Sequence, residues 1–162
     1  MKNKETKYLL DSNILIGFAL WKPMSLELNK FFWNKLSQLL KEKKWFLLDC
    51  VVQEIEKTFD QDFKKWCKKQ VEDGLVCKNT EDDKKRAISI NNSYKMIDDI
   101  TGKSEVDTYL LAFAERNGLG VFSMEKQKTP TDALFKIPDV CNFLGIKRIS
   151  KPKAFLESVG FK

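Results

Sequence analysis

Four carboxylates in this sequence follow apolar runs or open helical segments, at positions where an α/β fold would gather them. Asp11 directly follows YLL, and Glu54 lies a few residues after WFLL. Asp107 stands near the start of an alanine-containing helical segment, and Glu125 follows GVFS. Crowded carboxylates repel one another unless cations such as Mg²⁺ or Mn²⁺, which prefer oxygen ligands, relieve the repulsion. Because such ions can clamp a phosphodiester and activate water, the pattern indicates metal-dependent phosphodiester hydrolysis.

Each acid also has a purely structural interpretation. Asp11 could help to turn the chain together with the Ser-Asn pair that follows it. The spacing of Ser104 and Asp107 is close to a capping box, in which the acid would serve the helix start. Glu105 competes with Asp107 for the site, although two residues apart on a helix they point to different faces. The two glutamates, each taken alone, are ordinary solvated residues.

The sequence contains no histidine. This excludes Ser-His-Asp and Cys-His catalysis and any histidine general base, so carboxylates, lysines, hydroxyls or a metal must carry any chemistry. A zinc site is not expected either, since the cysteines lack a C-x-x-C pair. We expect reduced, partly buried thiols at all four: Cys50, Cys67, Cys77 and Cys141.

The chain is basic, with 29 Lys and Arg against 23 Asp and Glu and a net charge of +6. Nearly all of the positive charge is lysine, which suits contact with phosphates better than bidentate reading of bases. That balance fits binding to a nucleic-acid backbone. A lysine-rich composition is equally compatible with a genome rich in A and T.

Short apolar runs alternate with helical spacing along the chain. This alternation predicts an α/β fold with a mainly parallel central sheet flanked by helices. Ligand sites in such sheets lie beyond the carboxyl ends of the strands, where the four acids are expected. The expected strands are 7–11, 45–49 and 120–123, with a weak candidate at 75–78. The expected helices cover 14–20, a stretch from 25, the apolar spacing from 51 to 66, a region around 88–97, 104–117, a short one after 137 and a last one around 155–159.

At 162 residues the chain predicts a single domain, 1–162, without repeats or a linker. Its most charged part, residues 60–103, is a candidate lid or substrate-facing surface. The lysines at 64, 65, 68 and 69 could contact phosphates there, but a polar helix face explains them better. No apolar run could cross a bilayer, and the polar start is unlike a secretory signal, so we expect a cytoplasmic protein.

Together these segments resemble the PIN-domain family. YLLDSNILI resembles the opening strand with its acid, although Ser12 replaces the commoner Thr, and LLDCVVQEIEK is similar to the second motif. SEVDTYLLAFAERNGLGVFSMEK resembles the third and fourth motifs, and KIPDVCNFLGI is similar to a signature of an uncharacterised subgroup related to VapC-like toxins. The resemblance covers nearly the whole chain with the motifs in the family's order.

The resemblance implies a ribonuclease that uses Mg²⁺ or Mn²⁺, with Asp11, Glu54, Asp107 and Glu125 as metal ligands. Asn13 and Ser123 would orient these ligands from behind by hydrogen bonding. It further implies the toxin of a toxin–antitoxin pair, with an RNA substrate, an antitoxin protein as partner and a homodimeric state.

One departure leaves two questions open. Most PIN domains carry Asp as the fourth acid, whereas this chain has Glu125, with Asp132 as an alternative. A PIN fold that binds RNA or a protein partner without cleaving is the competing hypothesis. The sequence also leaves open whether the substrate is RNA or single-stranded DNA.

Overall fold

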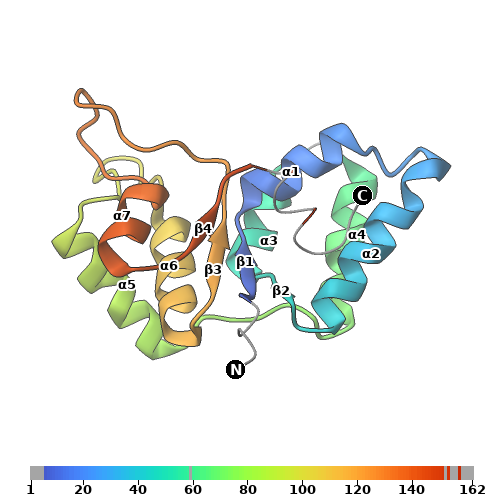
Figure 1. Ribbon diagram of the computed structural model, residues 1–162, viewed down its shortest axis with the longest axis horizontal. Helices are drawn as coiled ribbons and strands as arrows, with labels where there is room; N and C mark the ends of the chain where they lie inside the picture. Colours follow the sequence, from blue (N-terminus) through green and yellow to red (C-terminus); the bar gives the residue numbers. More distant parts are fainter. Residues whose placement is uncertain (1–5, 59, 152, 154–156, 158–162) are drawn as a thin grey trace. The chain divides into compact units, whose positions relative to one another are not determined.

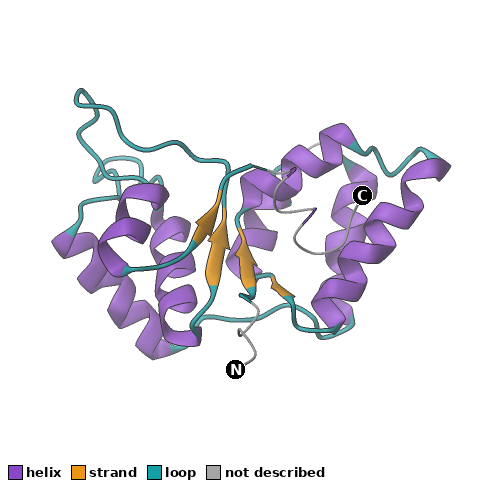
Figure 2. Cartoon of the chain, in the orientation of Figure 1, coloured by secondary structure: helices purple, strands orange, loops and turns teal. Residues whose placement is uncertain are grey.

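The computed structural model describes residues 6–58, 60–151, 153 and 157 (Figure 1). The chain forms two compact units, residues 1–78 and residues 79–162. Each unit combines a pair of parallel strands with helices (Figure 2). The expected α/β class, with parallel strands flanked by helices, is confirmed.

The strands of the first unit are short and almost entirely apolar. β1 (Tyr8–Leu10) pairs in parallel with β2 (Trp45–Phe46), so that Tyr8 lies opposite Trp45. Beyond β2, Leu48 forms an isolated parallel bridge with Cys77. Within the described residues, this bridge is what remains of the strand expected at 75–78. Consecutive residues of these runs, such as Leu9 and Leu10, are buried although their side chains point to opposite faces of the sheet. This explains why the runs do not alternate with polar residues.

The helices of the first unit differ from expectation at two places. The helix expected from residue 25 begins as a 3-10 turn, η1 (Glu27–Asn29), followed by α2 (Lys30–Lys41). The apolar spacing from 51 to 66 is divided between α3 (Asp49–Ile55) and α4 (Gln61–Glu72). Asp60 causes the second start, because its carboxylate accepts the N–H of Phe63 at 3.0 Å as an N-cap. α1 (Ser12–Trp21) forms as expected.

The core of the first unit includes an aromatic cluster around α2 and α4. The ring of Trp33 lies 5.7 Å from that of Phe63 and 5.1 Å from that of Trp66, centroid to centroid. The Trp33 indole also donates a hydrogen bond of 2.7 Å to the carbonyl of Lys22. At Trp33 these contacts combine a large buried apolar area with a satisfied indole N–H, whereas the indole N–H of Trp66 is buried without a hydrogen-bond partner among the described residues.

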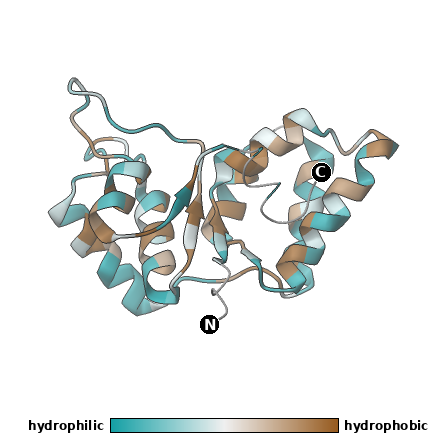
Figure 3. Ribbon diagram, viewed as in Figure 1, coloured by the Kyte–Doolittle hydropathy of each residue, from teal (hydrophilic) through white to brown (hydrophobic). Residues whose placement is uncertain are grey.

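In the second unit, β3 (Gly120–Phe122) pairs in parallel with β4 (Arg148–Ile149). β4 is absent from the expected elements because a two-residue strand that contains Arg gives no apolar run. The helices are α5 (Glu81–Ser93), α6 (Glu105–Asn117) and α7 (Ile137–Leu144). Helices in both units carry hydrophobic and hydrophilic residues around their circumference (Figure 3).

The charged stretch 60–103 contains α4 and α5, and each helix buries one side. Phe63 and Cys67 are buried on α4, as are Ala87 and Ile90 on α5. The lysines at 65, 68 and 69 are exposed, in agreement with a polar helix face. The lid remains a prediction.

The helix expected around Phe155, Leu156 and Val159 lies outside the described residues. Among the residues that the structure describes, no helix has both the length and the apolar composition needed to cross a membrane.

Candidate functional site

Asp11 occupies the junction between β1 and α1. Its backbone is still extended, with φ −81° and ψ 154°, and its Oδ1 accepts the N–H of Ser12 at 2.7 Å. Asp11 is therefore the N-cap of α1. An extended residue with a short acidic side chain is what an N-cap position favours. With only 5% of its surface exposed, Asp11 is also one of the few buried carboxylates.

Ser12 connects Asp11 to the second predicted ligand. Its hydroxyl donates a hydrogen bond of 2.7 Å to Oε2 of Glu54, which lies on α3. Helices α1 and α3 pack against each other, and this packing brings residues 42 positions apart into contact. Ser12 thus holds Asp11 through its backbone N–H and Glu54 through its side chain. Asn13, the next residue of α1, is half-buried.

Asp107 is the third residue of α6 and is half-buried. The capping box that its spacing from Ser104 allowed is not formed. Ser104 has a left-handed backbone, with φ 76°, and its side chain makes no cap hydrogen bond. A capping serine needs an extended backbone, so the left-handed conformation removes this structural explanation for Asp107.

Ser123 and Glu125 follow β3 and contact each other. The backbone N–H of Glu125 donates to the hydroxyl of Ser123 at 3.1 Å, and Ser123 is buried. Oε2 of Glu125 accepts the N–H of Ile137, the first residue of α7, at 3.0 Å. Burial raises the pKa of Glu125, and the Ile137 amide and the Lys136 ammonium only partly offset this rise. A cation beside this carboxylate would favour its ionised form.

Asp132, the alternative fourth acid, closes a turn. Its Oδ2 accepts the N–H of Thr129 at 2.7 Å and lies 3.8 Å from the Lys136 ammonium. The bonds to Thr129 hold the pKa of Asp132 below its usual range. Asp132 therefore has a local structural role, because its backbone N–H also donates to the carbonyl of Thr129 at 3.1 Å and the two residues close a turn.

The structure thus joins Asp11 and Glu54 within the first unit, while Asp107 and Glu125 belong to the second. Over residues 6–58, 60–151, 153 and 157, the Cys, Asp and Glu side chains form no group of three or more that could hold a metal ion. All four predicted ligands are oxygen donors of the kind that Mg²⁺ and Mn²⁺ prefer.

Sequence comparison places these residues in a family. The profile of the family described as "Domain of unknown function (DUF4411)" matches residues 8–162, which is nearly the whole chain. The chain belongs to this family. The match starts at the first residue of β1 and includes all four predicted ligands as well as Ser12. No curated protein matches the chain.

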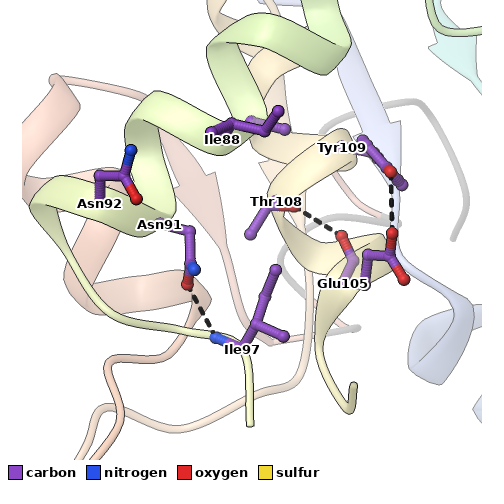
Figure 4. Close-up of a pocket in the computed structure, with 8 residues that line it drawn as sticks. Ile88, Asn91, Asn92, Ile97, Glu105, Thr108 and Tyr109 are labelled. Carbon is purple, nitrogen blue, oxygen red and sulfur yellow. Dashed lines mark hydrogen bonds between the residues drawn. The ribbon is translucent and has the colours of Figure 1, made fainter. Parts of the chain in front are cut away.

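A pocket of about 110 Å³ lies in the second unit of this DUF4411 member (Figure 4). Tyr109 donates its hydroxyl to Oε1 of Glu105 at 2.9 Å, and Thr108 donates to the carbonyl of Glu105 at 2.6 Å. None of the four predicted ligands lines this pocket. Glu105 lines it, whereas Asp107, two residues further along α6, does not. The lining residues come from α5, α6 and the segment between them: Ala87, Ile88, Asn91, Asn92, Ile97, Glu105, Thr108 and Tyr109.

The four cysteines of this DUF4411 member are free thiols, as expected. Burial raises the pKa of Cys50, Cys67 and Cys141 to about 12. Since the thiolate is the reactive form, these residues are not suited to nucleophilic chemistry at neutral pH.

Ser12 is the site residue whose importance the sequence did not show. Its place directly after Asp11 was the available signal, but its bond to Glu54 depends on how α1 packs against α3.

Proposed function

We propose that this chain is a metal-dependent endoribonuclease of the PIN type, which uses Mg²⁺ or Mn²⁺ to hydrolyse RNA phosphodiester bonds. The observation that carries the proposal is the tether at Ser12, whose N–H and hydroxyl bind the carboxylates of Asp11 and Glu54 at 2.7 Å each. The tether orients two acids that follow the two paired strands of the first unit. Hydrogen bonds to ligating carboxylates are a regular feature of metal sites.

Asp11 and Glu54 are the ligands that the described contacts support. Asp11 is buried, and an ionised carboxylate in such a place is costly unless opposite charge or hydrogen bonds compensate. The family resemblance adds Asp107 and Glu125 to the ligand set. Ser123, which accepts the N–H of Glu125, restrains the backbone of that ligand.

The proposed reaction is in-line hydrolysis by water, leaving a 5′-phosphate and a 3′-hydroxyl. A bound divalent cation would lower the pKa of the attacking water and would place positive charge next to the phosphate. Ser12 and Ser123 restrain the acids. The net positive charge of the chain, carried mainly by lysine, attracts the RNA backbone. This division of roles needs no histidine, which the chain lacks.

The resemblance extends the proposal to biological context. By this resemblance the enzyme would be the toxin of a toxin–antitoxin pair, homodimeric and inhibited by an antitoxin protein; the cytoplasmic location is proposed from the polar start and the absence of a long apolar run in the sequence. The competing hypothesis is a PIN fold that binds RNA or protein without cleaving. That alternative draws on Glu125, which stands where most PIN domains carry Asp.

The test is cleavage of a labelled pool of cellular RNA in the presence of Mg²⁺, Mn²⁺ or a chelator. Wild-type protein is compared with Asp11→Asn and Asp107→Asn, and with Glu105→Gln as a matched control on α6. We expect metal-dependent products that fall by roughly a hundred-fold or more in both Asn variants, while the control remains active. If folded wild-type protein binds RNA but yields no products with either metal, the non-cleaving alternative is correct.

A further inference from the structure

Three aromatic rings form a compact group in the second unit. Tyr94 follows α5, Phe135 precedes α7, and Phe143 lies on α7. Tyr94 and Phe143 are stacked, with ring centroids 4.6 Å apart and an interplanar angle of 12°. Phe135 stands nearly perpendicular to both, at 83° to Phe143 and 89° to Tyr94. We refer to Tyr94, Phe135 and Phe143 as the aromatic group.

Within the aromatic group, neither ring covers the face of Phe143 opposite Tyr94, and we call this its open face. Phe135 lies 5.5 Å from Phe143 and 6.3 Å from Tyr94, so it stands beside the stacked pair and does not cover the outer face of Phe143. In agreement, 53% of the surface of Phe143 is exposed. Its neighbours Val140 and Cys141 on α7 are fully buried, so Phe143 projects away from the side of the helix that enters the core.

Lysines accompany these rings. The Lys128 ammonium lies 5.3 Å from the centroid of Phe135, within the range of a cation–π contact. Lys95 and Lys136 directly follow rings of the aromatic group in the sequence. Both lie in partly exposed ion pairs, Lys136 at 3.8 Å from Asp132. Because exposed pairs contribute little free energy, phosphate oxygens can replace the carboxylates as partners.

We propose that the aromatic group is a binding platform for single-stranded RNA, on which one base stacks against the open face of Phe143. The lysines at 95, 128 and 136 would then contact the flanking phosphates. The proposal rests on the proposed function in taking RNA as the ligand, and it adds that the substrate is unpaired where it meets α7. Stacking on a ring tolerates any base, which fits a chain poor in the arginines that read base edges.

The alternative is that the aromatic group only packs α7 against the segment that follows α5. Packing alone would gain most from burying Phe143, because an exposed ring forfeits much of its transfer free energy. A parallel stack with one free face instead leaves a surface that matches a planar base. A substitution that keeps the apolar bulk of Phe143 but removes its ring distinguishes the two explanations.

The experiment is fluorescence anisotropy of a labelled 12-nucleotide oligo(A), with chelator present so that no cleavage occurs. It compares wild type with Phe143→Leu, which retains apolar bulk, and Phe143→Trp, which retains a stacking face. Ile100→Ala is the control for loss of an exposed apolar side chain, since Ile100 is 95% exposed in the same unit. An abasic oligomer of equal length measures backbone contacts alone.

We expect Phe143→Leu to weaken binding of oligo(A) between about five-fold and a hundred-fold, with Phe143→Trp and Ile100→Ala close to wild type. The abasic oligomer should bind wild type and Phe143→Leu equally. Unchanged oligo(A) binding by Phe143→Leu, or an equal loss with the abasic oligomer, would overturn the platform. Because the assay contains chelator, loss of the platform and loss of nuclease activity are separate results: a protein that binds through Phe143 but never cleaves contradicts only the proposed function.

Discussion

At the scale of single residues, Ser12 is the most informative position. A serine after a strand-ending acid looks like a turn residue, and its N–H does bind the Asp11 carboxylate. Its hydroxyl has a role that a turn residue does not explain, because it donates a hydrogen bond to Glu54 on another helix. Ser12 is itself buried, but Glu54 is half-buried, so this hydrogen bond is only partly shielded from competing water.

Replacing Ser12 by alanine should therefore raise the Mn²⁺ concentration needed for half-maximal RNA cleavage by about ten-fold, as loss of a bond to a ligating carboxylate does elsewhere. The free energy of unfolding should fall by only about 1 kcal/mol, the usual net value of one hydrogen bond. Titration of cleavage against Mn²⁺ measures the first effect and urea denaturation the second. Ser12→Thr keeps the hydroxyl and should restore the metal requirement; an unchanged requirement in Ser12→Ala would show that the tether has no part in metal binding.

At the scale of elements, α5 and α6 are joined by two ion pairs that run in opposite directions. Arg86 on α5 pairs with Glu115 on α6 at 2.6 Å, and Arg116 on α6 pairs with Asp83 on α5 at 2.6 Å. Asp83 also completes a capping box with Thr80 at the start of α5. The helix that carries Asp107 is therefore fixed to its neighbour by charges as well as by apolar contact.

Asp83→Asn should lower the free energy of unfolding by about 2 kcal/mol at neutral pH, because Asp83 is buried and its bonds to Arg116 are charged. Burial opposes ionisation of Asp83, but the bonds from Arg116 and Thr80 outweigh it and hold its pKa below the ordinary 3.8. A carboxyl with a lowered folded-state pKa stabilises the protein above its unfolded-state pKa, and this contribution disappears as the pH falls through the folded-state value. The difference in free energy of unfolding between wild type and Asp83→Asn should thus be constant near neutral pH and should decrease in acid.

Urea denaturation of wild type, Asp83→Asn and Asp82→Asn over a series of pH values tests this. Asp82 is the matched control, since it stands in the same first turn of α5 but is exposed. An equal cost for both substitutions, or a gap for Asp83→Asn that persists unchanged in acid, would contradict the assigned role.

At the scale of the whole molecule, the relevant property is the net charge of +6, carried mainly by lysine. Binding through lysine–phosphate contacts releases counterions from the nucleic acid, so affinity must fall as salt rises. With several such contacts, affinity for single-stranded RNA should fall about ten-fold or more between roughly 50 and 200 mM salt.

The measurement is anisotropy of the labelled oligo(A) across that salt range with chelator present. A double-stranded RNA of matched charge serves as the comparison, since it offers phosphates without exposed base faces. If the affinity for RNA does not change with salt, lysine–phosphate contacts do not contribute to binding.

The sequence by itself determined the fold class and the chemistry to expect. Apolar runs predicted strands at 7–11 and 120–123, and the structure forms them at 8–10 and 120–122, because burial of a strand requires such runs. The absence of histidine limited catalysis to carboxylates, lysines, hydroxyls and metals. It could not find β4, whose two residues carry no periodic signal, nor the division between α3 and α4, which depends on the N-cap at Asp60.

Only the tertiary structure decided which acids share a hydrogen-bonding partner and which aromatic side chains remain exposed. The bond between Ser12 and Glu54 spans 42 residues, and it exists because α1 packs against α3. The left-handed backbone at Ser104, which removes the capping box, and the exposure of Phe143 are likewise visible only in the structure. Local patterns record which residues are buried, but contacts between distant residues arise from packing, and no window of the sequence contains them.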